Sequence, residues 1–284
     1  MTAFVAEVSS NHHRDLGRAL AFVETASRIG CAAIKFQLFR VDELFAPEIL
    51  AKSAKHRARA QWELPEEFLS PLSARARDLG IQFACTPFSL RAVDVLQPHV
   101  DFYKIASYEL LWDDLLRACA GTGKPVAIAT GMATLDEVVR ATDVLRSAGC
   151  RDPFVLHCTS GYPTPVEQCN LAAIETIRAA TGARIGWSDH SVSPAVIFRA
   201  VHRWRAEMVE FHIDLDGTGA EFGAGHCWLP KQIAPVIESV LHGVAADGTG
   251  EKRPVDAEID DRPWRADPAD GLRPMRSIRA TWMP

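Results

Sequence analysis

The sequence lacks the features that mark several classes of protein. It contains no stretch of 18 apolar residues and no signal peptide, so we expect neither a membrane-spanning helix nor secretion, and a cytoplasmic location is the default. It also contains no block of lysines and arginines, and its formal net charge is only -5. We therefore expect no nucleic-acid partner and no membrane partner.

Paired cysteines are missing as well. The seven cysteines form no CxxC motif and are odd in number, and several lie inside apolar runs, as Cys85 and Cys158 do. A disulfide framework or a zinc knuckle needs paired spacings that this chain does not have. We expect the cysteines to be small, buried, apolar side chains in a reducing compartment.

What the chain does contain is eight short apolar runs, each of which ends on a polar or charged residue. Unbroken apolar runs indicate strands buried on both faces, and their alternation with helix-like stretches predicts a parallel sheet. Eight such units predict an α/β fold, a closed (β/α)8 TIM barrel, for which 284 residues and 48% hydrophobic content suffice. The expected strands lie near residues 4–8, 32–37, 82–86, 102–106, 125–130, 154–158, 184–188 and 208–213.

Helices are expected between these strands and after the last one. Thr134 and Glu137 have the spacing of a capping box, and Pro194 suits a first helical turn. The expected helices lie near residues 16–29, 65–79, 89–97, 112–121, 134–148, 170–181, 194–203 and 230–244.

Two segments depart from this rhythm. Residues 40–63 are charged and far longer than the usual βα connection of about 2–6 residues, so we expect an excursion over the barrel mouth. The C-terminal part is rich in Pro, Gly, Asp and Arg and has little periodicity. The predicted organisation is therefore a catalytic barrel over residues 1–246 and an extended C-terminal tail over residues 247–284.

Two lysines, Lys35 and Lys104, lie in apolar runs near the expected strand ends, where a TIM barrel gathers its chemistry. Burying an unpaired ammonium is costly, so two converging lysines would form a site for an anion such as a phosphate. The alternatives are lysines that reach solvent and lysines held in internal salt bridges. Hydroxyl donors at the same strand ends are Thr86, Ser107, Thr130, Ser160 and Ser188.

His190 and His212 close the seventh and eighth expected strands, which are neighbours in a barrel. Two neutral imidazoles there can share one divalent metal ion and leave positions for substrate and water, with Asp189 and Asp214 close by. The alternative for either histidine is a hydrogen-bonded core residue. His226 is either another residue of the barrel mouth or a loop histidine.

Two carboxylates are candidates for acid or base chemistry. Glu7 ends the first strand and Glu109 follows Ser107 by two residues. Each can act as an acid or a base if the pocket adjusts its pKa. The alternative is that they pair with Lys35 or Lys104.

Seven motifs, in register and in order from about residue 3 to 230, resemble the sialic acid (N-acetylneuraminate) synthase family. They are Ala6–His12, Ile34–Gln37, Phe102–Ser107, Ala129–Met132, His157–Pro165, Gly186–His190 and Val209–His212. The resemblance implies a transferase of carbohydrate biosynthesis, which condenses phosphoenolpyruvate with an open-chain amino sugar aldehyde. The product would be a 2-keto-3-deoxy sugar acid such as a sialic acid, with release of phosphate.

The resemblance also implies a role for each matching residue. His190 and His212 would hold a divalent ion, Mn²⁺ or Mg²⁺, that acts on the aldehyde, and either the ion or Glu7 would position the attacking water. Phosphoenolpyruvate would be held by Lys35, Thr86, Lys104, Ser107, Thr130, Ser160 and Ser188. The sugar would be faced by Gln37, Glu109 and Tyr162, with Glu221 or His226 in place of an aspartate that the family usually carries.

The chain departs from the family pattern at several points. Ala129 replaces a serine, Phe211 replaces a basic residue, and Gly219–His226 replaces the usual Gly-Pro-Asp segment. Gly271–Ser277 resembles the linker into an antifreeze-like domain that does not follow in this sequence. A more open acceptor pocket is then expected, unless a separate antifreeze-like domain protein covers it. A homodimer would have to use the barrel face or residues 247–284.

Two alternatives to the sialic acid reaction stay open. One is the same chemistry on a different acceptor aldehyde in specialised metabolism. The other is a non-catalytic relative that binds a sugar acid.

Overall fold

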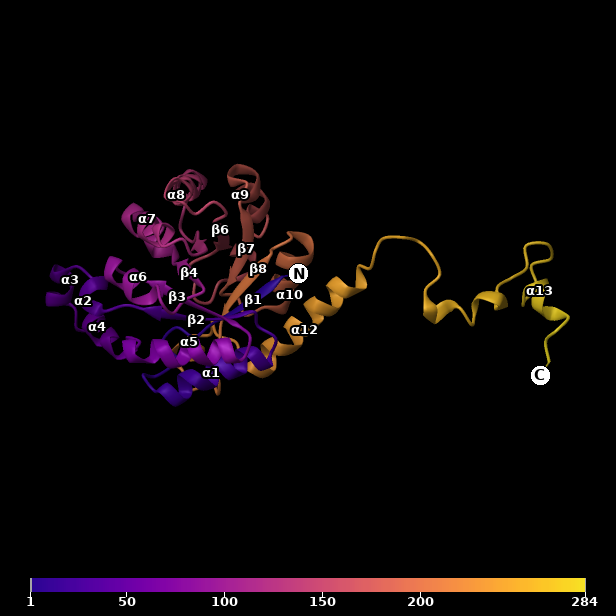
Figure 1. Cartoon of the computed structure of the whole chain (residues 1–284), viewed down its shortest axis with the longest axis horizontal. Helices are drawn as coiled ribbons and strands as arrows, with labels where there is room; N and C mark the ends of the chain where they lie inside the picture. Colours follow the sequence, from indigo (N-terminus) through magenta and orange to yellow (C-terminus); the bar gives the residue numbers. More distant parts are fainter. Residues whose placement is uncertain (1, 284) are drawn as a thin grey trace. The chain divides into compact units, whose positions relative to one another are not determined.

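The computed structural model describes residues 2–283 and contains a closed barrel of eight parallel strands in sequence order (Figure 1). Neighbouring strands pair in parallel around the whole ring, and the pairing of the last strand with the first closes it. The strands are β1 (Ala3–Glu7), β2 (Ala33–Leu38), β3 (Gln82–Pro87), β4 (Phe102–Ile105), β5 (Val126–Ala129), β6 (Phe154–Cys158), β7 (Arg184–Asp189) and β8 (Met208–His212). The predicted fold class is confirmed, and every predicted strand end lies within one residue of the observed end.

The helices between the strands begin and end on local sequence signals. The Asp15 side chain caps the first helix, and Thr134 and Glu137 form the predicted capping box. Gly182 ends another helix in the left-handed conformation, with a φ of 60°. The helices are α1 (Leu16–Arg28), α5 (Leu69–Asp78), α6 (Leu90–Leu96), α7 (Asp113–Gly121), α8 (Leu135–Ser147), α9 (Ala173–Thr181), α10 (Pro194–Phe198), α11 (Ala220–Gly223) and α12 (Pro230–Ala246).

The predicted excursion over residues 40–63 is largely helical. It forms α2 (Val41–Leu44), α3 (Pro47–Lys52), α4 (Ala54–Arg57) and a 3₁₀ helix over Ala58–Trp62. The Arg14 side chain, in the loop after β1, donates a hydrogen bond to the carbonyl of Ala60 at 3.0 Å. The excursion is therefore fastened to a loop at the carboxyl end of the barrel.

Two apolar clusters show which way the strand residues point. Along β1, Phe4 and Ala6 belong to an outer cluster with helix residues such as Phe22, whereas Val5 between them belongs to a second cluster. The second cluster consists of Val5, Ala33, Ala84, Phe102, Ala127, Phe154 and Leu156. Because successive strand residues point to opposite faces, this second cluster fills the inside of the barrel.

The same alternation places polar side chains inside the barrel at its carboxyl end. Two residues beyond Val5, Ala33 and Phe102 come Glu7, Lys35 and Lys104, and each of these three is buried. By the same spacing Thr86, Ser188, Glu210 and His212 also point inward, and all four are buried. The barrel interior is thus apolar toward the amino ends of the strands and charged toward their carboxyl ends.

The chain divides into two compact units, one ending at His242 and one beginning at Gly243, within α12. In the second unit, a 3₁₀ helix over Asp256–Glu258, another over Arg262–Trp264 and α13 (Arg276–Arg279) interrupt the predicted extended tail. The Asp267 side chain accepts a hydrogen bond from the backbone N–H of Arg276 at 2.8 Å, which holds these turns together. Residue 284 of the predicted tail lies outside the described residues.

Two predictions from absent features can be compared with the structure. All seven cysteines are buried and free. No helix in residues 2–283 combines the length and the apolar character that crossing a membrane requires.

Candidate functional site

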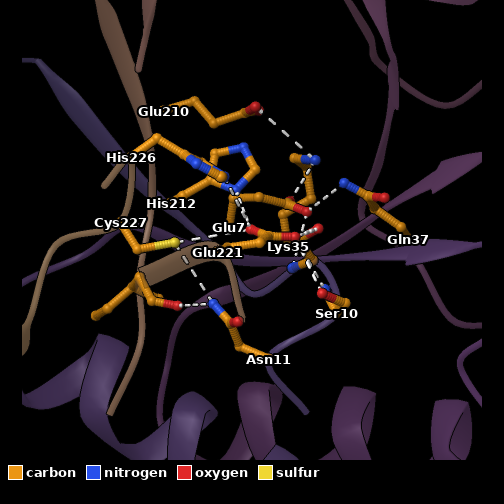
Figure 2. Close-up of polar contacts among 12 residues, drawn as sticks. Glu7, Ser10, Asn11, Lys35, Gln37, Glu210, His212, Glu221, His226 and Cys227 are labelled. Atoms are coloured by element: carbon orange, nitrogen blue, oxygen red, sulfur yellow. Dashed lines mark hydrogen bonds and ion pairs between the residues drawn. The ribbon is translucent and has the colours of Figure 1, made fainter. Parts of the chain in front are cut away.

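Two lysines and two glutamates form a buried ionic network inside the barrel, and three of its members, Glu7, Lys35 and Glu210, are shown in Figure 2. Lys35 forms an ion pair with Glu7, and its Nζ donates a hydrogen bond to Thr86 Oγ1 at 3.1 Å. Glu210 Oε1 lies 2.9 Å from Lys104 Nζ and 3.8 Å from Lys35 Nζ. The structure therefore brings the two predicted lysines together, and the alternative of internal salt bridges is the arrangement observed.

The charged forms of Glu210 and Lys35 are favoured despite their burial. Burial opposes the charged form of Glu210, but Lys104 and Lys35 outweigh it and hold the pKa of Glu210 below its usual value. Burial likewise opposes the charged form of Lys35, but Glu210 and Glu7 raise its pKa. The network combines two basic and two acidic side chains, so removing one member would leave a partner without its counter-charge.

Glu210 is the member of the network that the sequence analysis missed as a site residue. It lies inside an apolar run, between Val209 and Phe211, and is 2% exposed. Its signal was its spacing, because it precedes His212 by two residues and so shares the inward face of β8. Ser188 Oγ donates a hydrogen bond to Glu210 Oε1 at 3.3 Å, which attaches β7 to the network.

The hydroxyls of Ser107 and Ser160 lie close to the backbone of Gly131, just after the carboxyl ends of β4, β6 and β5, respectively. The Gly131 N–H donates a hydrogen bond to Ser107 Oγ at 2.9 Å. A Cβ at Gly131 would lie 2.1 Å from Ser160 Oγ and 2.9 Å from Ser107 Oγ. Among the side chains of residues 2–283, Ser160 Oγ is one of the few buried polar atoms without a hydrogen-bond partner. We call Ser107, Gly131 and Ser160 the hydroxyl cradle.

One predicted hydroxyl donor is used by the fold. Thr130 Oγ1 donates a hydrogen bond to the carbonyl of Leu156 at 3.3 Å, across β5 and β6. Its proton is therefore engaged with the backbone, unlike the hydroxyl of Ser160.

The imidazoles of His190 and His212 lie side by side, with ring centroids 5.4 Å apart. His190 Nδ1 lies 2.8 Å from the carbonyl oxygen of Thr159, and His212 Nδ1 lies 2.8 Å from Glu221 Oε2. Both partners are acceptors, so each Nδ1 carries a proton and Nε2 is the nitrogen that faces away from this bond. The predicted pair is therefore adjacent and oriented in the way that metal-binding histidines usually are.

The two histidines differ in charge. Burial lowers the pKa of His190 to about 3, with a smaller contribution from the positive charge of His212. Burial also opposes the charged form of His212, but Glu221 outweighs it and raises the pKa of His212 above its usual value. Glu221 thus favours the charged form of His212, and the pKa of Glu221 is correspondingly lowered.

Glu221 is the centre of a second polar group. Its Oε1 accepts hydrogen bonds from the hydroxyls of Ser9 and Ser10, the latter at 3.1 Å. Its Oε2 lies 3.4 Å from His226 Nε2 and 3.7 Å from Cys227 Sγ (Figure 2). His226 is therefore a residue of the barrel mouth, and Cys227 differs from the prediction because its thiol lies among polar groups.

The predicted sugar-facing residues surround these groups. The Tyr162 ring lies 4.2 Å from the His190 ring and 5.1 Å from the His226 ring, measured between centroids. Gln37 Nε2 donates a hydrogen bond to Glu7 Oε1 at 2.8 Å. Glu109 forms no ion pair with either lysine in the described part of the chain, and its buried Oε2 has no hydrogen-bond partner there.

Two aspartates that the sequence placed near the metal pair serve other groups. Asp189 accepts a hydrogen bond from the indole N–H of Trp228 at 3.1 Å. Asp214 forms an ion pair with Arg18 at 2.6 Å and accepts a hydrogen bond from the Gly219 N–H. Proximity in sequence was misleading here, because neighbouring residues at a strand end point in different directions.

The carboxyl of Glu109 supports a prediction for pH-dependent stability. Burial raises its pKa to about 7, and nearby Lys104 only partly offsets this. Since the folded state binds this proton more tightly than the unfolded state, Glu109 should cost stability as the pH rises from about 5 to about 8. Glu109→Gln should therefore become more stable relative to wild type over this interval, in urea unfolding at a series of pH values. A constant difference across the interval would contradict the raised pKa, and Glu207→Gln, at an exposed carboxylate, is the control.

Comparison with known protein families gives one match over most of the chain. A family model described as the NeuB family matches residues 22–252. An uncharacterized protein of Methanocaldococcus jannaschii is 35% identical over 262 residues, which cover 91% of this chain and 76% of that protein. The N,N'-diacetyllegionaminic acid synthase of Legionella pneumophila is 33% identical over 280 residues, covering 91% of this chain and 77% of the synthase.

Solved structures agree with the sequence comparisons. The crystal structure of an N-acetylneuraminic acid synthetase from Leptospira borgpetersenii superposes with a TM-score of 0.80 and 28% identity, over 92% of this chain and 90% of the synthetase. A truncated 3-deoxy-D-arabino-heptulosonate 7-phosphate synthase from Thermotoga maritima has a TM-score of 0.67 at 14% identity, covering 87% of this chain and 88% of that one. This second likeness shows the shared fold alone.

Proposed function

The chain belongs to the NeuB family, and from this premise we propose that it condenses phosphoenolpyruvate with an open-chain amino sugar aldehyde. The products would be a 2-keto-3-deoxy sugar acid, such as a sialic acid, and phosphate. The names of the relatives, which include synthases of legionaminic and pseudaminic acids, support an amino sugar as the acceptor. The alternative is the same chemistry on another acceptor aldehyde. Assays with a panel of aldoses would distinguish this alternative from condensation with an amino sugar.

The observation that carries the proposal is the buried network beside the hydroxyl cradle. Lys35 and Lys104 place two ammonium groups inside the barrel, where a phosphate or a carboxylate can form charge-assisted hydrogen bonds. Ser160 Oγ is buried without a partner in the described structure, as expected of a group whose partner is a ligand. Thr86 and Ser188 line the same interior and are the remaining hydroxyls proposed for phosphoenolpyruvate.

A divalent ion of the manganese or magnesium class fits His190 and His212. Their rings are adjacent, and each Nδ1 is engaged by an acceptor, so that Nε2 is the nitrogen that would bind the ion; at His212 the ion would displace the Nε2 proton. A carbonyl or carboxylate behind each imidazole is the usual support of a metal-binding histidine. When bound, the ion would supply Lewis-acid polarisation of the aldehyde oxygen.

The remaining proposed roles fall to the chain's own carboxylates and to the sugar-facing residues. Glu7 would accept the proton of the water that adds to the enolpyruvyl carbon, and its ion pair with Lys35 would hold the carboxylate in position. Glu109, Gln37 and Tyr162 would face the acceptor sugar. Holding both substrates in attack geometry would supply much of the rate enhancement.

Several further features remain proposals. We place the enzyme in the cytoplasm, where small-molecule substrates would be its partners. Homodimer formation and a separate antifreeze-like domain protein over the acceptor pocket also stay predictions.

The proposed reaction can be tested by measuring phosphate release from phosphoenolpyruvate. The purified chain would be assayed with Mn²⁺ and a panel of aldoses that includes N-acetylated amino sugars and sugars without nitrogen. We expect release that depends on both the aldehyde and the metal. Phosphoenolpyruvate binding with no release for any aldehyde would instead favour the non-catalytic sugar-acid-binding protein.

A methyl group in the hydroxyl cradle should block the phosphate. In Gly131→Ala the new Cβ would lie 2.1 Å from Ser160 Oγ and would displace it from the cradle. Loss of one charge-assisted hydrogen bond, about 1.5–3 kcal/mol, should weaken phosphoenolpyruvate binding by about 10–100-fold in calorimetric titration. Gly121→Ala is the matched control, because a Cβ there meets nothing within 4 Å. Equal affinities of the two variants would remove the cradle from the proposed site.

A further inference from the structure

Three potential metal ligands meet on the Nδ1 side of the His212 ring (Figure 2). They are Glu221, His226 and Cys227, and their ligand atoms and that of His212 all lie within 4.8 Å of one another. His226 is 7% exposed and Cys227 is 3% exposed, so both lie out of bulk solvent. This group is distinct from the His190–His212 pair, which uses the opposite nitrogens of the two rings.

The spacing of the donors matches one small ion. Tetrahedral zinc, with bonds of about 2.0–2.3 Å to nitrogen, oxygen and sulfur, holds its ligand atoms about 3.3–3.8 Å apart. Glu221 Oε2 lies 3.4 Å from His226 Nε2 and 3.7 Å from Cys227 Sγ. Both distances therefore lie in the range of a tetrahedral site, and the remaining ligand atoms lie within 4.8 Å of one another.

Surrounding groups hold two of the three ligands, Glu221 and Cys227, as an outer shell would. Ser9 and Ser10 donate to Glu221 Oε1, which leaves Oε2 facing the histidine and the thiol. Asn11 Nδ2 lies 3.5 Å from Cys227 Sγ, as a donor to a thiolate would. Residues that hydrogen-bond to metal ligands usually fix the orientation of those ligands in this way.

One atom of the group lacks a partner. Among the side chains of residues 2–283, the buried His226 Nδ1 forms no hydrogen bond. The other ring nitrogen, Nε2, has only the 3.4 Å contact to Glu221, so the buried imidazole is poorly satisfied, and an ion would add a metal–nitrogen bond at Nε2.

We propose that Glu221, His226 and Cys227 bind one thiophilic divalent ion of the zinc class. Binding would convert the Cys227 thiol into a thiolate–metal bond and release its proton to solvent. A thiolate with an imidazole and a carboxylate suits zinc, whereas manganese and magnesium favour oxygen ligands. Three protein ligands leave a fourth position for water or a ligand atom.

The proposed ion has a structural consequence for the neighbouring site. Glu221 would bind the ion and also accept the hydrogen bond from His212 Nδ1, so the ion would fix the carboxylate that orients His212. It would also tie the segment Gly219–Cys227 to the loop that carries Ser9 and Ser10. The ion site itself does not depend on the proposed condensation reaction.

The test is the zinc content and the cobalt spectrum of the full chain. The protein would be stripped with a chelator, titrated with Zn²⁺ or Co²⁺ and compared with Cys227→Ser and His226→Gln. We expect one tightly bound zinc per wild-type chain and a thiolate-to-cobalt charge-transfer band. Loss of a direct ligand should lower zinc affinity by more than the ~10–100-fold typical of an outer-shell change, and Cys227→Ser should abolish the band.

Matched variants separate the site from general effects. Cys31→Ser and His99→Gln change the same residue types elsewhere in the fold and should keep wild-type zinc affinity. If Cys227→Ser does not fold, His226→Gln still tests the affinity. Wild type without stoichiometric zinc or without the charge-transfer band, or Cys227→Ser and His226→Gln with unchanged affinity, would overturn the proposal. Phosphate release with Mn²⁺ is measured separately, so failure of the condensation reaction would be distinguishable.

Discussion

Replacing Glu7 by glutamine is expected to lower turnover by about 10²–10⁴-fold, the usual contribution of a positioned acid or base. Glu7 is fully buried at the end of β1, where Lys35 and Gln37 hold its carboxylate. An amide keeps the size of the side chain but cannot accept a proton. Phosphoenolpyruvate affinity should stay nearly intact, because both lysines and the hydroxyl cradle remain.

The measurement combines phosphate release under saturating substrates with calorimetric titration of phosphoenolpyruvate. Glu24→Gln is a suitable control, since this carboxylate lies on the surface in an exposed ion pair with Arg75. Unchanged turnover in Glu7→Gln would remove Glu7 from the proposed mechanism. A loss of phosphoenolpyruvate affinity equal to the loss of turnover would assign Glu7 to substrate binding instead.

Replacing Glu210 by glutamine is expected to destabilise the fold by about 3–5 kcal/mol, the usual cost of removing one partner from a buried ion pair. Glu210 faces both Lys104 and Lys35, so its loss leaves the network with an uncompensated positive charge. The anionic phosphoenolpyruvate would then be the missing counter-charge. Its addition should raise the unfolding free energy of Glu210→Gln more than that of wild type.

Urea unfolding with and without phosphoenolpyruvate measures both effects. The matched control is Glu207→Gln. Glu207 directly precedes β8 and pairs with Arg184 at the start of β7, and both side chains are exposed. Surface ion pairs of that kind contribute only about 0–1 kcal/mol. If the two variants unfold alike, the buried network does not have the role given to it here.

Much of the barrel and of its charged interior follows from the order of apolar and polar residues. Each of the eight apolar runs ends on a polar residue, and strand alternation then decides which of these side chains point inward. That is why Lys35, Lys104, His190 and His212 were found from the sequence. Glu210 was missed because it is a single carboxylate inside an apolar run. Its inward direction becomes evident only from its position two residues before His212, on the same face of the strand.

Contacts between strands that are distant in the sequence could not be predicted from this alternation. Lys104 and Glu210 are separated by 106 residues and meet because β4 and β8 face the same enclosed interior. Glu7 and His212 are register partners only because β8 closes the ring onto β1. Asp189 and Asp214 show that closeness in sequence does not ensure contact. They are near His190 and His212 in the sequence, but they bind Trp228 and Arg18 instead.

The linear pattern of the chain by itself determined the eight strands, the buried face of each and the types of polar side chain that enter the barrel. Only the tertiary structure decided which of these groups are partners: that Glu210 faces both lysines, that Glu221 orients His212, and that Cys227 lies beside Glu221 and His226. The physical reason is that the direction of a strand side chain depends on local alternation, whereas charge pairing and metal-ligand geometry depend on distances that ring closure and the loop Gly219–Cys227 establish.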